Sequence, residues 1–178
     1  MRLRPLVVLA VLVLLAGAGG FVAAIRYGAA AVRGGSGYEQ SIPSTSAPVW
    51  IGVYVRNTSA IPVTLRGFVP RGAENLRILE ARVTDRKDGG FSMLSEPLDA
   101  GLQRAIARSR PLDGFVLPAA RRDDHQVVVL VQRIDPERRA VLHGGAVLYS
   151  ALGFDQGARD DGVSCIRPAV RGAVPCPG

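Results

Sequence analysis

The chain has 178 residues, of which 48% are hydrophobic, and its formal net charge is +7. This length is enough for one domain once an N-terminal targeting segment is set aside. The charge does not indicate a nucleic-acid partner, because Arg2, Arg4, Arg26 and Arg33 flank one apolar run and the other arginines alternate with acidic residues.

The apolar run extends from Leu6 to Ile25 without a charged residue. As a helix it would span about 30 Å, the thickness of a bilayer hydrocarbon core. Arg2 and Arg4 precede it, so the positive-inside rule predicts a cytoplasmic N-terminus and an extracytoplasmic remainder. Residues 1–26 are therefore predicted to anchor a single-pass protein in the cell membrane. The alternative is a cleaved signal peptide, ending at the small residues 16–18, and a secreted product.

Residues 27–48 are rich in Gly, Ala, Ser and Pro and predict a flexible linker. Residues 49–156 contain alternating or β-branched runs bounded by turn residues. The predicted strands are 50–56, 61–68, 76–84, 115–117, 126–134 and 140–153, with Gly144 and Gly145 marking a bulge or a second turn. Helical spacing of apolar residues predicts one short helix that begins near Leu98, with Ser95 as its N-cap, and ends near Arg108.

This pattern indicates a mainly β fold: an immunoglobulin-like antiparallel β-sandwich preceded by one N-terminal transmembrane helix. The segment 53–68, VYVRNTSAIPVTLRGF, resembles the opening hairpin of immunoglobulin-like domains in uncharacterised exported proteins of high-GC Gram-positive bacteria. Residues 115–152 are similar to the closing strands of the same domains, in which an F-x-L-P turn leads into a valine-rich strand. The resemblance covers about half of the exported chain, and it implies a fold and a location without a functional site.

Residues 157–178 are predicted to form a C-terminal tail without strong secondary structure. They contain the only cysteines, Cys165 and Cys176. In an oxidising compartment the pair predicts a structural disulfide. A redox role would require C-x-x-C spacing, and a metal site would require further ligands, whereas the tail contains no histidine.

The two histidines are candidates for chemistry. His125 is predicted to lie in a polar turn and His143 on a strand, and together with Asp124 they could in principle hold a metal ion. The register of the two strands is not fixed by the sequence. A solvated histidine and a half-buried histidine explain both residues without special geometry.

Asp155, Asp160 and Asp161 are predicted to form a surface turn, because the ligand spacing and closing glutamate of a calcium loop are absent. The sequence contains no nucleophile elbow and no phosphate-binding glycine motif. We therefore predict no catalytic residue, no cofactor and no metal ligand.

Trp50 and Tyr54 are the candidate contacts for a protein partner if they are exposed. A lone tryptophan at the start of a strand otherwise belongs to the core. The leading interpretation is a membrane-anchored extracytoplasmic β-sandwich that acts through protein–protein contacts as an accessory or envelope protein. The alternative is a module that binds a small ligand or cell-wall glycan, which an exposed aromatic row on one sheet face would favour. An enzyme is the third interpretation.

Overall fold

A computed structural model describes residues 13–15, 17, 20, 32–34, 39–85, 90–95, 97–119, 125–169 and 176. Within this part of the chain, no helix is both long enough and apolar enough to cross a membrane. Most of the predicted anchor, residues 6–25, lies outside the described residues.

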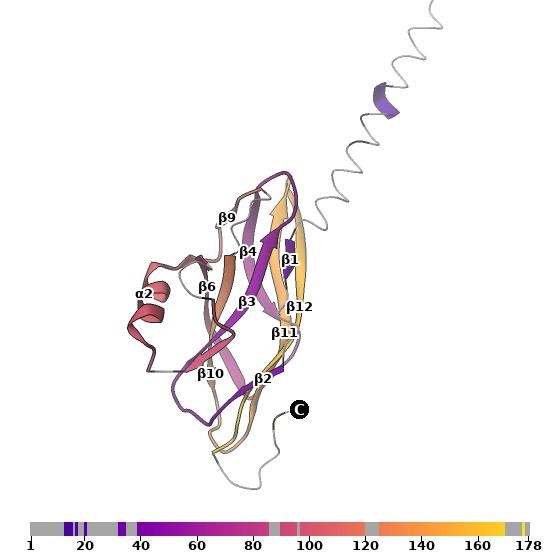
Figure 1. Cartoon of the computed structure of the whole chain (residues 1–178). Coiled ribbons are helices and arrows are strands. Elements are labelled where there is room, and N and C mark those ends of the chain that lie inside the picture. The colour runs from indigo at the N-terminus through magenta and orange to yellow at the C-terminus, as the bar shows by residue number, and fades with distance from the viewer. Residues whose placement is uncertain are drawn as a thin grey trace, which may run out of the picture.

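The described chain is mainly β and forms two sheets (Figure 1). The first sheet contains β1 (Val32–Gly34), β3 (Val49–Asn57), β6 (Leu76–Asp85), β7 (Met93–Ser95), β8 (Arg110–Pro111) and β10 (His125–Arg133). The second contains β2 (Glu39–Ile42), β4 (Val63–Pro70), β5 (Ala73–Glu74), β9 (Val116–Leu117), β11 (Ala140–Ala151) and β12 (Phe154–Ile166). One helix, α2 (Ala100–Arg108), joins β7 to β8.

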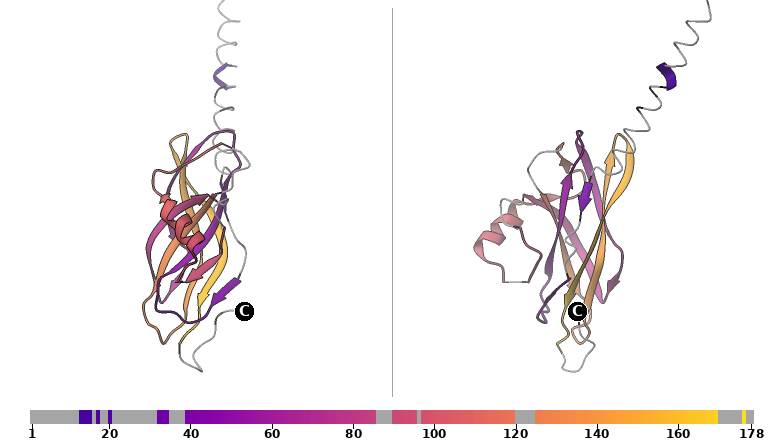
Figure 2. Two further views of the ribbon diagram at one scale, coloured as in Figure 1. Left: turned by 60° about the vertical axis from the view of Figure 1, so that its left-hand side comes forward. Right: turned by 45° about the vertical axis from the view of Figure 1, so that its right-hand side comes forward.

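The strand order of the first sheet is β1-β3-β10-β6-β8, with β7 also beside β3. The order of the second sheet is β2-β12-β11-β4-β9, with β5 also beside β11. Every pairing among the described strands is antiparallel except that of β2 with β12. The two sheets pack face to face, as the right-hand view of Figure 2 shows.

Alternating side chains from both sheets form the main core. On β3, Val53 and Val55 point into this core, and on β11, Val147 and Tyr149 meet them from the other sheet. All four are at least 99% buried. This alternation is the one predicted for residues 50–56, because successive side chains of a strand point to opposite faces.

A second apolar cluster covers the outer face of the first sheet. Its buried members are Trp50, Phe91, Leu98 and Val128, and Leu102 and Ile106 of α2 pack against them. Figure 2 (left) shows α2 lying across this face. The cluster explains the amphipathic pattern of the helix, whose apolar stripe needs a surface to cover.

Gln126 fixes the segment before α2 to the first sheet. The residue is fully buried on β10, where its Oε1 accepts a hydrogen bond from the backbone N–H of Phe91 at 3.2 Å. Its side-chain amide donates to the carbonyl of the same residue. One strand away, the backbone N–H of Gly52 donates to the carbonyl of Ser92 at 2.8 Å. The segment that contains Phe91 and Ser92, which we call the crossing segment, is thereby hydrogen-bonded to both β10 and β3.

The predicted helix is present, but its N-cap differs from the prediction. The cap is Asp99, whose Oδ1 accepts hydrogen bonds from the backbone N–H groups of Gly101 at 2.8 Å and Leu102 at 2.9 Å. Ser95 instead ends β7. An aspartate directly before the first helical residue satisfies two amide groups that would otherwise lack partners, so the prediction of Ser95 was wrong.

The strands extend beyond the predicted domain limits of 49–156. The residues assigned to a linker, 27–48, include β1 and β2, which are too short to show a periodic pattern. β12 continues to Ile166, ten residues into the predicted tail. Its alternating buried positions hold small or polar residues, namely Ala158, Asp160, Gly162 and Ser164, so hydrophobicity did not reveal the strand.

The predicted disulfide is confirmed. Cys165 and Cys176 are bonded, with their Cα atoms 5.9 Å apart, and Cys165 is buried on β12. The bond closes a loop with a sequence separation of 11.

Replacing both cysteines by alanine should lower the free energy of unfolding by about 3 kcal/mol, since the open loop regains conformational entropy in the unfolded state. Denaturant unfolding of the full-length chain in detergent, followed by Trp50 fluorescence, measures this change. Reduced wild-type protein is the matched control and should lose a similar amount. Equal stability of the oxidised and double-alanine proteins would contradict the expectation.

Candidate functional site

The outer faces of the two sheets differ. The first is covered by α2, whereas no described element lies over the second. We call the outward side of β4, β11 and β12 the open face. Cross-strand partners share a side of a sheet, so the register places two rows on this face. They are Val69–Ala146–Arg159 and Gly67–Leu148–Gly157.

Exposed apolar side chains form the middle of the open face. Val69 is 48% exposed and Leu148 is 37% exposed, on neighbouring strands. Gly157 adds no side chain of its own and lies against Leu148 and Ala146. The centre of the face is therefore flat and apolar, with Arg159 beside it.

A β-bulge shapes one end of the open face. Between the pairs His143–Val163 and Gly145–Asp160, β11 contributes one residue and β12 contributes two. Gly144 is the single residue and adopts a φ of +60°. Such a bulge redirects side chains, and here Asp161 of β12 forms an ion pair with Arg71, beyond the end of β4. The prediction of a bulge or a second turn at Gly144 is thus resolved as a bulge.

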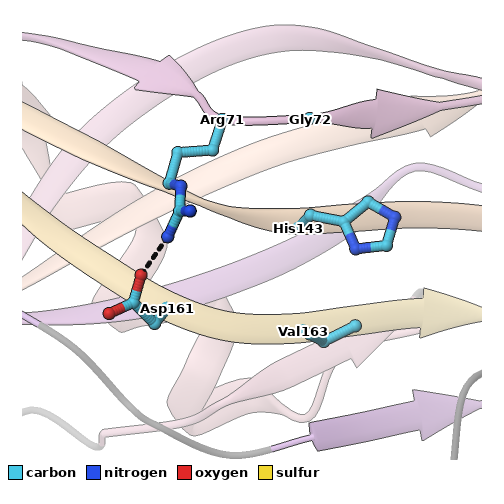
Figure 3. Close-up of a pocket in the computed structure, with 5 residues that line it drawn as sticks. All are labelled: Arg71, Gly72, His143, Asp161 and Val163. Carbon is cyan, nitrogen blue, oxygen red and sulfur yellow. Dashed lines mark hydrogen bonds and ion pairs between the residues drawn. The ribbon is translucent and has the colours of Figure 1, made fainter.

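Beside the bulge is a shallow hollow of about 360 Å³. Arg71, Gly72, His143, Asp161 and Val163 line it (Figure 3). The imidazole of His143 and the Arg71–Asp161 ion pair come from three different strands or turns. The hollow therefore presents both charges and a heteroaromatic ring next to the apolar centre of the open face.

Glu74 on β5 links His143, which lines the hollow, to Arg139, which lies just before β11. Its Oε1 lies 2.9 Å from Nε2 of His143, and its Oε2 lies 3.2 Å from a guanidinium nitrogen of Arg139. The hydrogen bond from His143 lowers the pKa of Glu74, and the Arg139 guanidinium lowers it further. Glu74 is thereby kept ionised, which suits a charged contact and not the donation of a proton.

Replacing His143 by alanine should raise the pKa of Glu74 toward the ordinary glutamate value, because the largest cause of its depression is removed. The sign follows from linkage: a depressed carboxyl pKa contributes stability above the unfolded pKa, and that contribution is lost as the pH falls through the folded pKa. Carboxyl-carbon NMR titration of Glu74 measures the shift. Arg66→Ala, on the same sheet and outside this cluster, is the control; an unchanged titration of Glu74 in the histidine variant would contradict the assignment.

The two histidines lie in different sheets and near opposite ends of the strands. His125 begins β10 opposite Val55, while His143 lies beside Gly72. His125 is 5% exposed, which corrects the prediction of a solvated turn. Its Nε2 lies 3.2 Å from Asp85, and its ring meets Phe115 edge-on at 5.5 Å. The structure thus separates the histidines that the sequence suggested as joint metal ligands, and Asp124 lies outside the described residues.

Other predicted candidates are also redistributed. Trp50 is 5% exposed beneath α2, so it packs as part of the core and does not meet the condition for a partner contact. Tyr54, on the same side of β3, is half-buried. Asp155, Asp160 and Asp161 lie on β12 and not in a turn, and Asp160 is buried. Among the described residues, no three His, Cys, Asp or Glu side chains are grouped so as to hold a metal ion.

The apolar residues of the open face, and Arg71 and Glu74 beside it, were not selected from the sequence, which singled out only His143 and the aspartates of β12 in this region. Leu148 belongs to a predicted strand and Val69 directly follows one, but their exposure depends on which face is left uncovered. Arg71 and Glu74 lie near each other in sequence, but their partners Asp161 and His143 come from positions that are distant along the chain. The one available signal was the Gly144–Gly145 pair, which marked the bulge.

No family model matches the sequence, and no curated protein matches it. Among solved structures, the chain is similar to the VesB protease of Vibrio cholerae, with 10% sequence identity and a TM-score of 0.39. The similarity covers 80% of this chain and 33% of that chain, so this chain spans about one third of its length. A similarity at this level carries no argument about activity.

Proposed function

We propose that this protein is a membrane-anchored, extracytoplasmic immunoglobulin-like β-sandwich that binds a protein partner through the open face. The strand order supports the fold assignment. With β1, β3, β10 and β6 taken as strands A, B, E and D, and β4, β11 and β12 as C, F and G, both sheets follow the immunoglobulin order. The charge-free segment Leu6–Ile25 supports the anchor, and the disulfide is consistent with an oxidising compartment.

The observation that carries the binding role is the unequal treatment of the two outer faces. Trp50 and its apolar neighbours on the outer face of the first sheet are covered by α2 and are therefore buried. Val69 and Leu148 on the second sheet are left exposed at diagonal positions of the neighbouring strands β4 and β11. Contiguous exposed apolar residues with a polar rim are typical of protein interfaces.

The open face also has the charge distribution of an interface. Its apolar centre is bordered by Arg159 and Asp155, both exposed, and by the Arg71–Asp161 ion pair. Charges at a rim contribute mainly to the rate and selectivity of association, while the apolar centre provides most of the affinity. We therefore expect Leu148 to be the residue whose replacement weakens binding most.

Among the described residues, Phe154 is the single exposed aromatic residue, and it lies at a hairpin end. This arrangement provides no aromatic row on a sheet face, which is the feature that would favour a glycan-binding module. We advance the protein-contact function alone.

A photo-crosslinking amino acid at Val69, in the full-length chain in its native membrane, tests the proposal. We expect one discrete protein adduct, and we expect Leu148→Asp in the same chain to abolish it. The matched control is Leu79→Asp, because Leu79 is 43% exposed on the first sheet and should not affect the adduct. An adduct that survives Leu148→Asp, or that is lost equally in both variants, would show that the open face is not the binding surface.

A further inference from the structure

The end of the domain that receives the N-terminal segment carries a cluster of exposed apolar residues. Val32, the first residue of β1, pairs with Asn57 at the end of β3, and β1 also contacts β12. The turn after β3, residues 58–62, leads into β4, whose Thr64 pairs with Ser150 near the end of β11. The β11–β12 hairpin therefore lies at the same end as Val32; in Figure 1 the arrowheads of β3 and β11 both point to it. We call this end the apex.

Three residues of the apex expose large apolar side chains. Leu152 and Val116 are each 56% exposed, and Phe154 is 41% exposed. Leu152 and Phe154 belong to the β11–β12 hairpin, and Val116 lies on β9 opposite Thr64. Residues 57–65, 114–119 and 149–154, which build this part of the apex, contain no charged side chain, and Asp155, opposite Ser150, is the first charge beyond them on β12.

The opposite end of the two sheets has a different character. Its turns carry exposed or half-buried charged residues, namely Arg71, Glu74, Asp135, Glu137, Arg138 and Arg139, and one exposed large apolar residue, Ile134. Residues 86–89, after β6, and residues 121–124, before β10, lie outside the described residues, and their sequences contain charges of both signs. Apolar exposure is thus concentrated around the hairpin.

The turn between β11 and β12 has a leucine, Leu152, at a position that disfavours large side chains. Leu152 and Gly153 have φ values of +51° and +82°, the positive pair that a type I′ turn requires. Asparagine or glycine is strongly preferred at the first of these positions, because a larger side chain clashes with its own backbone. A leucine here is both conformationally strained and exposed to solvent. Such departures from local preference concentrate at functional positions.

The distance to the membrane is limited by the chain. Six residues, 26–31, separate Ile25 from Val32, and at about 3.5 Å per residue they reach no more than about 25 Å. The first strand, β1, thus begins only six residues after the apolar segment, whereas the predicted linker of residues 27–48 would have separated residue 26 from the first strand by 22 residues. Because β1 begins at the apex, this end of the domain is tethered within about 25 Å of the apolar segment.

We propose that the β11–β12 hairpin and Val116 insert into the interfacial region of the bilayer that holds the N-terminal segment. Leu152 and Phe154 bury their side chains at the boundary between headgroups and acyl chains, as apolar residues of interfacial segments do. The strands then stand away from the membrane, and the open face is presented along their length. This inference rests on the membrane anchor of the proposed function.

The test uses the full-length chain in phosphatidylcholine–phosphatidylglycerol vesicles, with a benzoylphenylalanine at position 154 or, as the matched control, at position 134. We expect a phospholipid adduct, detected by mass spectrometry, at position 154 and none at position 134. Leu152→Asn should reduce the adduct at position 154 while raising the melting temperature, because asparagine suits the turn. Ile134→Asn should leave the adduct unchanged.

The outcomes separate the two proposals. Adducts at neither position, or at both equally, with the protein still resistant to carbonate extraction, would overturn the apex contact and leave the anchor intact. A protein adduct at position 154 without a lipid adduct would also overturn it, since the hairpin would then be a protein interface. Release of the chain by carbonate would refute the anchor and the apex contact together.

Discussion

Gly144→Ala should lower the free energy of unfolding by about 4 kcal/mol, through the strain of a side chain in the left-handed region and overpacking against the neighbouring strand. Gly144 has a φ of +60°, and a Cβ atom there would overlap the backbone carbonyl of Asp160 on β12. Because that neighbour is backbone, relief requires β12 to move away from β11. Denaturant unfolding of the full-length chain in detergent, followed by the fluorescence of Trp50, provides the measurement.

The bulge also positions Asp161, so the same variant should weaken the ion pair between Asp161 and Arg71. Gly153→Ala is the matched control: its φ is +82°, but no atom lies within 4 Å of the added Cβ. It should therefore show the conformational part of the effect alone, about 1 kcal/mol. If the two variants had the same free energy of unfolding, the close approach of β12 to Gly144 would not contribute to stability, and the expectation would be wrong.

Gly52→Ala should destabilise the fold by a similar amount, about 4 kcal/mol, and should loosen the cover over the first sheet. A Cβ atom at this position would overlap the Phe91 carbonyl and the side-chain amide of Gln126. The added methyl group would break the hydrogen bonds between the Gln126 side chain and the Phe91 backbone, and it would leave buried polar atoms without hydrogen-bond partners. We expect faster hydrogen exchange in α2 and a red-shifted emission of Trp50 in the folded state.

Gly67→Ala is the control for this variant, since Gly67 is also a strand glycine but has nothing within 4 Å of the added Cβ. It should change stability by less than about 1 kcal/mol, because alanine costs less entropy than glycine in a strand. A folded Gly52→Ala protein with unchanged exchange in α2 would indicate that the crossing segment moves freely and does not hold the helix in place.

The two-sheet architecture was largely predictable because the strongest strands are long apolar runs: β10 is rich in valine and buried on both sides, between the main core and the cluster under α2. Residues 126–134 and 140–153 match β10 and β11 within one or two residues. The disulfide was predicted from the count of two cysteines together with the predicted extracytoplasmic location. In each case a feature of the sequence corresponds directly to one physical requirement, either burial of a strand or the pairing of two cysteines.

The remaining features depend on tertiary contacts that a linear pattern does not contain. β12 was missed because its buried positions are filled by Ala158, Asp160, Gly162 and Ser164, which have no hydrophobic signature. His125 was assigned to a turn because polar residues precede it, yet Asp85 and Phe115 bury it. The open face could not be identified either, since exposure of Leu148 depends on the absence of a covering helix over that sheet.

The position of the disulfide has a mechanical consequence. The chain enters β1 at the apex, while β12 ends at Ile166 at the opposite end, and Cys165 ties Cys176 to that end. A pull between the N-terminal segment and the far end would therefore run along the strands. Hydrogen bonds between strands lie across this direction, so the β1–β3 and β2–β12 pairs would resist in shear, with several bonds loaded at once. Tension between these two ends would thus load the hydrogen bonds of each pair together and not one after another.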